Sequence, residues 1–474
     1  MTALWSGVEL SAVLGGAPSK PPSATVSGVS IDSRTLAPGD LFVAIKGDAH
    51  DGHDHVARAF EAGASAAVVS RERAHELAAL GPVFAVADTL KAMETLGLAA
   101  RRRSKAKIVA VTGSVGKTTA KEMLRAMLTA CGETHASAAS YNNHWGVPLT
   151  LARMLANARF GVIEMGMNHA GEITPLTRMA RPHAAFVTTI APVHIEYLGS
   201  IEAIADAKAE IFLGLEPHGT AVLNRDAPQF ERLAKAAGAR GARILSFGHG
   251  ADCDARLLEV GAIDGGSRVK ARLLGRAVTF ELGAPGVHMA ENALGALLAA
   301  EALGADLGAC AAALRAFSPQ KGRGERFSVA TPDGPATIID ESYNANPASM
   351  RAALALLAAA KPGPEGRRIA VIGDMLELGP KAAAMHAELA ADLSASKVDL
   401  LFGAGPLTRA LYEAAPPSMR AAWTERSSEL TDEVARTLRG GDIAMIKGSN
   451  GSRMGPLVAA LRDRFAHRPG GQAC

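Results

Sequence analysis

Lys-Ile-Val-Ala-Val-Thr-Gly-Ser-Val-Gly-Lys-Thr-Thr, residues 107–119, is the stretch that decides the fold of this chain. Its apolar, β-branched run at 108–111 predicts a buried strand, and the pattern that follows residue 119 predicts an amphipathic helix. Two glycines and a lysine lie between these elements. A glycine turn from a strand to a helix N-terminus favours phosphate binding, because backbone N–H groups and the helix dipole both attract an anion.

The turn has the spacing G-x-x-G-K-T, which is shorter than the common G-x-x-x-x-G-K-[ST] form, because Val111 stands where that form has its first glycine. Lys117 would bring a positive charge to the phosphates, and the Thr118 hydroxyl would ligate Mg²⁺. The alternative interpretation is an ordinary turn with a surface lysine. We expect the whole loop to bind phosphate: Thr112, Gly113, Ser114, Val115, Gly116, Lys117, Thr118 and Thr119.

Composition excludes several classes of protein. The 474 residues suggest about three domains at roughly 150 residues each. Fifty basic and 47 acidic residues leave a formal charge of +3, so we expect no nucleic-acid partner and no attraction to a membrane surface. Four distant cysteines without a C-x-x-C pair indicate reduced thiols. We find no signal peptide and no apolar run of membrane-spanning length, and therefore expect a soluble, cytoplasmic monomer without membrane insertion.

The hydrophobic pattern predicts an α/β protein of three domains. Residues 1–106 form a small α/β domain, residues 107–317 a central doubly wound parallel sheet that carries the phosphate-binding loop, and residues 318–474 a Rossmann-like α/β domain. Strands are expected at 26–31, 41–46, 66–70, 83–87, 108–111, 160–166, 185–191, 336–340, 368–373, 399–403 and 442–447. Helices are expected at 54–63, 89–103, 201–215, 288–303, 347–360, 380–393 and 453–464.

The composition of two further segments predicts a hinge and a tail. Residues 318–326 are charged and glycine-punctuated, which predicts a hinge between the second and third domains. Residues 468–474 are expected to be a disordered tail.

Polar side chains follow the central strands. Glu164 ends one expected strand, and His194 follows the next. In open parallel sheets ligands gather at the carboxyl ends of strands, so both should face the phosphate-binding loop. Thr118 and Glu164 would suit Mg²⁺, whereas His194 is equally well explained as a structural loop histidine.

Other candidates are ambiguous from their residue types alone. Asn142 and Asn143 suit either a polar ligand or a turn. The segment 340–349 joins a strand to a helix and is rich in hydrogen-bonding side chains, although Asn346 also suits a helix cap. Lys208 alone is typical of a helix surface, and Arg34 alone of a solvated turn.

Taken together, seven segments resemble the Mur ligase family, the ATP-dependent amide-forming enzymes of peptidoglycan precursor synthesis. The resemblance covers nearly the whole chain and rests on residues 112–119, 141–150, 164–173, 207–212, 321–327, 340–350 and 373–379. Within the family, the last two segments resemble the branch that adds D-alanyl-D-alanine. That resemblance implies ligation of D-Ala-D-Ala to the terminal carboxylate of UDP-N-acetylmuramoyl-tripeptide through an acyl phosphate, and hence a part in cell-wall biogenesis, cell shape and cell division.

The resemblance also implies roles for single residues. Lys117, Glu164, His194 and Lys208 would be catalytic, and Thr118 with the last three would hold two Mg²⁺ ions, Lys208 as a carbamate formed with CO₂. Asn292, Arg323 and Asp340 would contact ATP. Ser33, Arg34, Asn142 and Asn143 would contact the UDP-linked substrate, and Asn344 and Asn346 the dipeptide. His386, Lys447 and Arg453 are further candidates for which a plain structural role is the simpler interpretation.

Three alternatives stay open at this point. The first is the sibling ligase that adds diaminopimelate or lysine, although the Asp-Asn-Pro-Arg motif frequent in that branch is missing. The second is a folylpolyglutamate-type ligase, which the Asp-Ser-Arg turn at 32–34 disfavours. The third is a nucleotide-binding module without ligase activity, which would lack phosphate release dependent on an amine.

Overall fold

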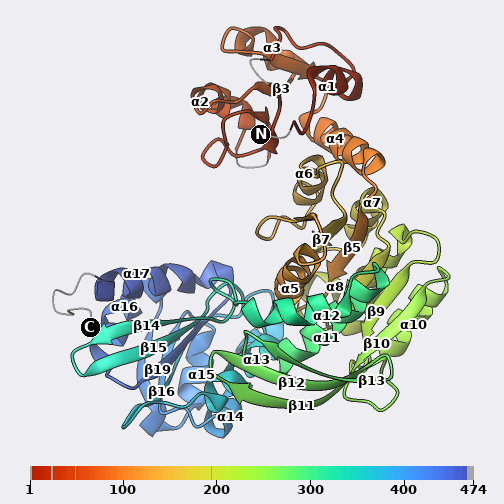
Figure 1. Cartoon of the computed structure of the whole chain (residues 1–474). Coiled ribbons are helices and arrows are strands. Elements are labelled where there is room, and N and C mark those ends of the chain that lie inside the picture. Colours follow the sequence, from red (N-terminus) through yellow and green to blue (C-terminus); the bar gives the residue numbers. More distant parts are fainter. Residues whose placement is uncertain (1–2, 23–24, 48–49, 194, 467–474) are drawn as a thin grey trace.

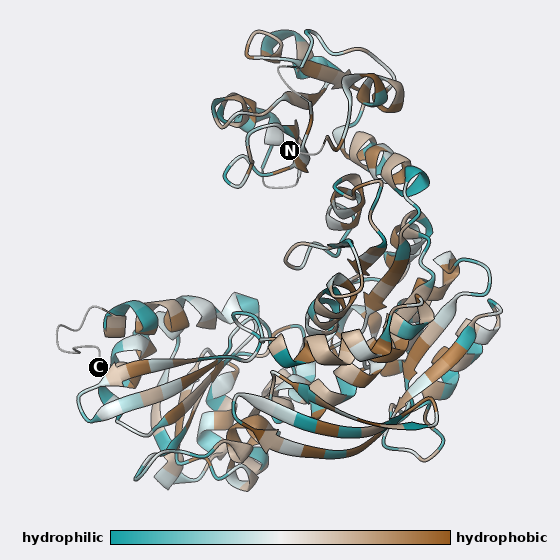
Figure 2. Ribbon diagram, viewed as in Figure 1, coloured by the Kyte–Doolittle hydropathy of each residue, from teal (hydrophilic) through white to brown (hydrophobic). Residues whose placement is uncertain are grey.

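Three separate sheets divide the chain in the computed structural model, which describes residues 3–22, 25–47, 50–193 and 195–466. The sheets lie inside the three ranges expected from the sequence, and Figure 1 shows them as successive bodies from the N-terminal end to the C-terminal end. Figure 2 shows hydrophobic residues concentrated along the strands and on the helix faces that cover them. No helix among the described residues is long and apolar enough to cross a membrane.

The N-terminal sheet has four parallel strands in the order β1-β2-β3-β4. Their bounds are β1 Gly28–Ser30, β2 Asp40–Val43, β3 Ala66–Ser70 and β4 Val83–Val86. Its helices are α1 Gly7–Leu14, α2 Val56–Glu61, α3 Arg71–Leu77 and α4 Thr89–Arg103. Two of these helices, α1 and α3, were not expected, since both are short and their apolar pattern is weak. The N-terminus of α1 is nevertheless stabilised by a capping box formed by Ser6 and Glu9.

The central sheet has nine strands in the order β13-β12-β11-β10-β9-β8-β5-β7-β6. Their bounds are β5 Lys107–Thr112, β6 Thr134–Ala136, β7 Phe160–Glu164, β8 Ala184–Val187, β9 Thr220–Asn224, β10 Arg243–Gly248, β11 Ala255–Ile263, β12 Gly266–Leu273 and β13 Arg276–Leu282. The strands from β6 to β11 pair in parallel. The sheet is therefore doubly wound around the phosphate-binding loop, as expected.

The expectation of a purely parallel central sheet is wrong at one edge. Strands β11, β12 and β13 pair antiparallel through two tight hairpins. The first hairpin turns at Asp264 and Gly265, an Asp-Gly pair that favours a two-residue turn, and Gly265 adopts a left-handed backbone with a φ of 69°. The alternating burial of β12 is typical of a strand with one solvated face.

Helices cover both faces of the central sheet. One face packs against α5 Lys117–Thr129, α11 Val287–Ala302 and α12 Leu307–Ala313. The other packs against α6 Gly146–Ala152, α7 Ile173–Ala180, α9 Ile201–Ala209 and α10 Phe230–Gly238, and the short α8 Ile195–Leu198 lies beside α9.

The C-terminal sheet has the order β14-β15-β19-β16-β17-β18. Only β14 Glu325–Thr331 runs antiparallel; β15 Gly334–Glu341, β19 Ile443–Lys447, β16 Arg368–Gly373, β17 Leu400–Ala404 and β18 Arg420–Thr424 are parallel. Helices α13 Pro347–Ala359, α14 Ala382–Ala395 and α15 Thr408–Ala414 cover one face, and α16 Ser427–Thr437 and α17 Met454–Ala466 the other. Because β14 begins at Glu325, the expected hinge is shorter than predicted and ends at residue 324.

The N-terminal body is attached to the central one through helix packing. Helix α4 lies against α6, and the indole of Trp5 donates a 3.0 Å hydrogen bond to the Ala152 carbonyl. The Arg103 guanidinium stacks over the same indole ring at 3.7 Å from its centroid. On the other side, the C-terminal body faces the carboxyl ends of the central strands (Figure 1).

Candidate functional site

The phosphate-binding loop has the backbone that its sequence predicts. Gly116 precedes α5 with a φ of 84°, a left-handed conformation that glycine adopts without strain. The Ser114 N–H donates to the Thr189 carbonyl at 2.7 Å, which ties the loop to the segment after β8. Lys117 Nζ donates to the Gly113 carbonyl at 2.8 Å. The Lys117 side chain is thus folded back over the loop and bonded to its backbone.

Glu164 lies close enough to this loop for its carboxylate to raise the pKa of Lys117. It ends β7, which pairs with β5, and only 1% of its surface is exposed. Its Oε1 accepts a 2.8 Å hydrogen bond from Asn142 Nδ2, whereas its buried Oε2 has no hydrogen-bond partner among the described residues. Burying a carboxylate oxygen without a hydrogen-bond partner costs free energy of desolvation unless a bound cation compensates for it.

Two lysines are electrostatically coupled to this carboxylate or to each other. Burial lowers the pKa of Lys117, while the Glu164 carboxylate raises it and the Arg323 guanidinium lowers it. Lys208, at the end of α9, is only 1% exposed. Burial holds the pKa of its amine well below the ordinary value, and the Lys117 charge lowers that pKa further. The helix-surface interpretation of Lys208 is therefore wrong.

The C-terminal domain supplies the opposite wall. Arg323, in the hinge, stacks over the Tyr343 ring at 3.8 Å from its centroid, and its guanidinium donates to Ser140 Oγ of the central domain at 3.4 Å. This contact links the hinge to the loop that carries Asn142.

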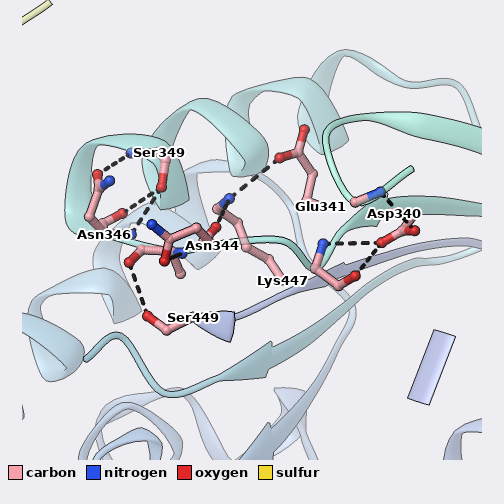
Figure 3. Close-up of polar contacts among 10 residues, drawn as sticks. Asp340, Glu341, Asn344, Asn346, Ser349, Lys447 and Ser449 are labelled. Carbon is pink, nitrogen blue, oxygen red and sulfur yellow. Dashed lines mark hydrogen bonds and ion pairs between the residues drawn. The ribbon is translucent and has the colours of Figure 1, made fainter. Parts of the chain in front are cut away.

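Lys447 and Glu341 form a pair beside Arg323. They are register partners at the ends of the parallel strands β19 and β15. Figure 3 shows the Lys447 ammonium between the Glu341 carboxylate, 3.4 Å away, and the Asn344 carbonyl, 2.9 Å away. The Lys447 side chain is 3% exposed. Its burial in the cleft wall shows that Lys447 is not a solvated loop residue.

These two walls enclose one cleft with a cavity of about 450 Å³. From the central domain it is lined by the phosphate-binding loop, Asn142, Glu164 and Asn292; from the C-terminal domain by Arg323, Glu341, Asn344, Asn346 and Lys447. Asn292 on α11 packs so close to the loop that a Cβ on Gly116 would lie 2.8 Å from its Nδ2. The cleft thus gathers most of the expected ATP-side residues.

Other expected residues lie away from the cleft or hold the backbone. Asp340 is fully buried, and its carboxylate accepts hydrogen bonds from the Gly322 N–H and the Ser342 hydroxyl, so it fixes the hinge turn. Asn143 is exposed and accepts from the N–H groups of Trp145 and Gly146 at the start of α6. His194 lies outside the described residues.

The C-terminal asparagines and His386 have local structural partners. Asn346 caps α13, since its Oδ1 accepts from the Ser349 N–H at 2.9 Å. Asn344 Oδ1 accepts from the Ala345 N–H. His386 is fully buried; its Nε2 accepts from the Met375 N–H, and burial lowers its pKa, which keeps it neutral. The structural interpretation of His386 is confirmed.

Ser33 and Arg34 lie in the turn after β1, in the N-terminal domain and outside the cleft. Ser33 is 8% exposed. The Arg34 guanidinium is 74% exposed and pairs with Asp32 at 2.7 Å, which holds the pKa of that carboxyl at about 2. The exposed guanidinium is available to an anionic ligand.

A second cavity, of about 700 Å³, opens at the carboxyl edge of the C-terminal sheet. Arg426 before α16 and Arg453 before α17 line it, with Asp374 and Leu376 after β16. Both arginines are exposed and neither forms an ion pair within the described part of the chain. Asp374 is buried and accepts from the Thr408 N–H at 2.8 Å, so it fixes the cavity floor.

The sequence interpretation missed Arg426 and His288. Arg426 directly precedes a helix that was not predicted, so no pattern singled it out. His288 lines the cleft from α11. Burial lowers the pKa of its imidazole, and the Glu341 carboxylate partly opposes this lowering, so His288 lies beside the C-terminal wall. Its position four residues before Asn292, on the same helix face, was the available signal.

Comparison with known proteins gives a consistent result. Three family models match: "Mur ligase family, catalytic domain" over residues 25–126, "Mur ligase middle domain" over 111–300, and "Mur ligase, glutamate ligase domain" over 322–450. The UDP-N-acetylmuramoyl-tripeptide–D-alanyl-D-alanine ligase of Escherichia coli K12 is 34% identical over 445 residues, which cover 93% of this chain and 94% of that protein.

Two solved structures share the fold. The crystal structure of MurF from Acinetobacter baumannii superposes with a TM-score of 0.82 at 29% identity, covering 97% of this chain and 99% of that chain. MurF ligase from Thermotoga maritima, solved in complex with ADP, gives a TM-score of 0.75 at 23% identity, covering 93% and 98%.

Proposed function

The chain belongs to the Mur ligase family, and from this premise we propose that it joins D-alanyl-D-alanine to UDP-N-acetylmuramoyl-tripeptide at the expense of ATP. The single observation that carries the assignment is the relationship over nearly the full chain to ligases of that name. The cleft between the central and C-terminal domains is consistent with it, because a phosphate-binding loop there faces cationic side chains of a second domain.

The reaction has two steps. The terminal carboxylate of the tripeptide attacks the γ-phosphorus of ATP, a C–O–P bond forms, the bond to the β-phosphate breaks, and ADP departs. The free amine of D-Ala-D-Ala then attacks the acyl carbon, the C–O bond to phosphate breaks, and the amide forms. Because two anions meet in the first step, Lys117 and Arg323 would neutralise charge there. Closing the cleft would keep water from the acyl phosphate.

Mg²⁺ fits the central wall. The orphaned Oε2 of Glu164 and the buried hydroxyl of Thr118 are hard oxygen donors beside the phosphate-binding loop. When bound, Mg²⁺ supplies positive charge to the phosphates. His194 and Lys208 remain our proposed ligands of a second ion.

The proposed carbamylation of Lys208 is supported by its burial. An amine reacts with CO₂ only in its neutral form, and the lowered pKa of Lys208 favours that form. A carbamate would place a negative group where Lys208 otherwise has a neutral amine, close enough to Lys117 to interact with its charge. Lys208 would then have the charge that a metal ligand needs.

We assign the amino substrate to the C-terminal cavity. The dipeptide carries a carboxylate, and two guanidinium groups without ion pairs among the described residues, Arg426 and Arg453, line this cavity. Leu376 adds an apolar surface for a methyl group. This assignment replaces Asn344 and Asn346 as the principal dipeptide contacts, since both side chains bond to local backbone N–H groups.

The remaining roles follow the domain order. The exposed Arg34 and the neighbouring Ser33 would hold the UDP-linked substrate in the N-terminal domain, residues 1–106. The central domain, 107–317, would bind ATP, with Asn292 at the nucleotide; Arg323 and Asp340 would act from the hinge, and residues 318–474 would bind the dipeptide. Three free cysteines in the described residues favour a reducing cytoplasm, and we propose a monomer.

An acceptor comparison tests the assignment. Purified protein is incubated with ATP and UDP-MurNAc-tripeptide, and phosphate release is followed with D-Ala-D-Ala, diaminopimelate or L-lysine as acceptor; the same acceptors are offered with the UDP-linked dipeptide. We expect release only with the tripeptide and D-Ala-D-Ala. Release with the UDP-linked dipeptide and diaminopimelate or lysine would assign the sibling activity, and nucleotide binding without amine-dependent release would assign a binding module.

A further inference from the structure

Lys447 occupies an unusual place for a structural lysine. Its side chain is 3% exposed, yet it lines the same cleft as the phosphate-binding loop. Among the described residues its ammonium donates only to Glu341 and to the Asn344 carbonyl. An ammonium has three N–H donors, so one stays available to a ligand in the cleft. The contact with Glu341, at 3.4 Å, is also longer than a strong charge-assisted bond.

The chain after Lys447 connects the two cavities. Lys447 lines the ATP cleft, and four to six residues later Gly451, Ser452 and Arg453 line the proposed dipeptide cavity. This connection is held in place at Ser449, whose Oγ accepts from the Leu376 N–H at 2.9 Å and whose N–H donates to the Asp374 carbonyl. Lys447 therefore stands at the boundary that the dipeptide amine must cross to reach an acyl phosphate.

The central wall already serves the phosphates of ATP. Lys117, the N-terminus of α5 and Glu164 all lie on that wall, and Arg323 stands between the two walls, close enough to influence the charges of both Lys117 and Lys447. Lys447 belongs to the opposite, C-terminal wall, and the chain that follows it lines the proposed dipeptide cavity.

We propose that Lys447 is a catalytic residue of the second step, in which its ammonium binds the phosphate of the acyl phosphate and stabilises it as it leaves. The proposal rests on the proposed function. The neutral amine of the dipeptide forms the N–C bond, the C–O bond to phosphate breaks with its electron pair on oxygen, and the amine proton passes to that phosphate. Glu341, 3.4 Å from Lys447 Nζ, holds the ammonium in position before the acyl phosphate forms.

Separating the two steps tests this role. Without dipeptide, enzyme, ATP and UDP-MurNAc-tripeptide are quenched with borohydride, which reduces the acyl phosphate to a stable alcohol; with dipeptide, amide formation is timed. For Lys447→Met we expect acyl phosphate to form within about threefold of the wild-type rate and ligation to fall by roughly 10²–10³-fold, as for removal of one charge-stabilising group. Lys447→Arg should recover part of the ligation.

The exposed Lys361 in the same domain provides a matched control, and Lys361→Met should change neither step. If Lys447→Met fails to fold, because Glu341 is left unpaired, the double variant Glu341→Gln/Lys447→Met removes both charges and should give the same separation of steps.

Ligation within threefold of wild type in the folded variant, or equal losses of acyl phosphate and ligation, would overturn the role of Lys447. Absence of any trapped alcohol with the wild-type enzyme would instead overturn the proposed function, and this proposal with it.

Discussion

Replacing Asn142 with alanine tests whether the loop before α6 serves the carboxylate of Glu164 rather than the UDP-linked substrate. Asn142 Nδ2 donates 2.8 Å to Glu164 Oε1, and the other oxygen of this buried carboxylate has no partner among the described residues. Alanine would leave both oxygens without a hydrogen-bond donor. The carboxylate would lose its fixed orientation toward the phosphate-binding loop, and with it the placement of the oxygen that we propose as an Mg²⁺ ligand.

The size of the effect follows from this contact. A hydrogen bond to a charged group contributes about 1.5–3 kcal/mol. Since roughly 1.4 kcal/mol corresponds to a tenfold change in an equilibrium constant, Mg²⁺ affinity should fall by about 10–100-fold, the range typical for loss of a partner of a metal ligand.

Magnesium titration of the ligation rate measures this effect. For Asn142→Ala we expect half-saturation at about 10–100-fold higher Mg²⁺, with an unchanged KM for the UDP-linked substrate. Asn143→Ala is the matched control, because Asn143 is exposed and its side chain only accepts from the N–H groups of Trp145 and Gly146; it should cost about 1 kcal/mol of stability and leave the Mg²⁺ requirement unchanged. A raised KM for the UDP-linked substrate with an unaltered Mg²⁺ requirement would refute the reasoning.

The other predictions concern two lysines, Lys117 and Lys208, and one histidine, His183. Lys117→Ala should abolish ligation while the protein still binds the UDP-linked substrate in a calorimetric titration, and wild-type-like turnover would defeat the assignment of the loop. Protein supplied with ¹³C-bicarbonate should show a carbamate carbon signal that Lys208→Ala lacks; identical spectra would contradict carbamylation. Burial lowers the pKa of His183 to about 4, so the folded state binds fewer protons than the unfolded state below the ordinary histidine pKa. Stability should therefore decline as the pH falls from about 6.5 to about 4, by about 1–2 kcal/mol after allowance for the partial exposure of this ring. His183→Gln should remove that part of the slope in denaturant unfolding, and an unchanged slope would contradict it.

Local patterns predicted the parts of this molecule that short stretches determine. The strand, glycine turn and helix at 107–129 were predictable because each element is specified by its own residues. Glu164 was predictable as a candidate since it ends a continuous apolar strand. The antiparallel edge strands were not predicted, because the strand-helix alternation of the parallel sheet was assumed to continue through the whole central domain. The Asp264-Gly265 pair was nevertheless a signal for a hairpin.

Sequence patterns could not predict the contacts between segments that lie far apart along the chain. The pairing of Lys447 with Glu341 depends on β19 lying beside β15, which are separated by three other strands along the chain. The burial of Lys208 likewise depends on helix packing, so its sequence near acidic residues indicated a solvated surface. The cavity at Arg426 and Arg453 is built from four separate loops.

The central claim is that the tripeptide carboxylate attacks the γ-phosphorus of ATP in the cleft between the central and C-terminal domains. The most direct measurement uses UDP-MurNAc-tripeptide with ¹⁸O in its terminal carboxylate, followed by mass analysis of the phosphate released during ligation to D-Ala-D-Ala. Our account predicts one ¹⁸O atom in each phosphate, because the bond that breaks in the second step lies between the acyl carbon and that oxygen. Phosphate without ¹⁸O would contradict it.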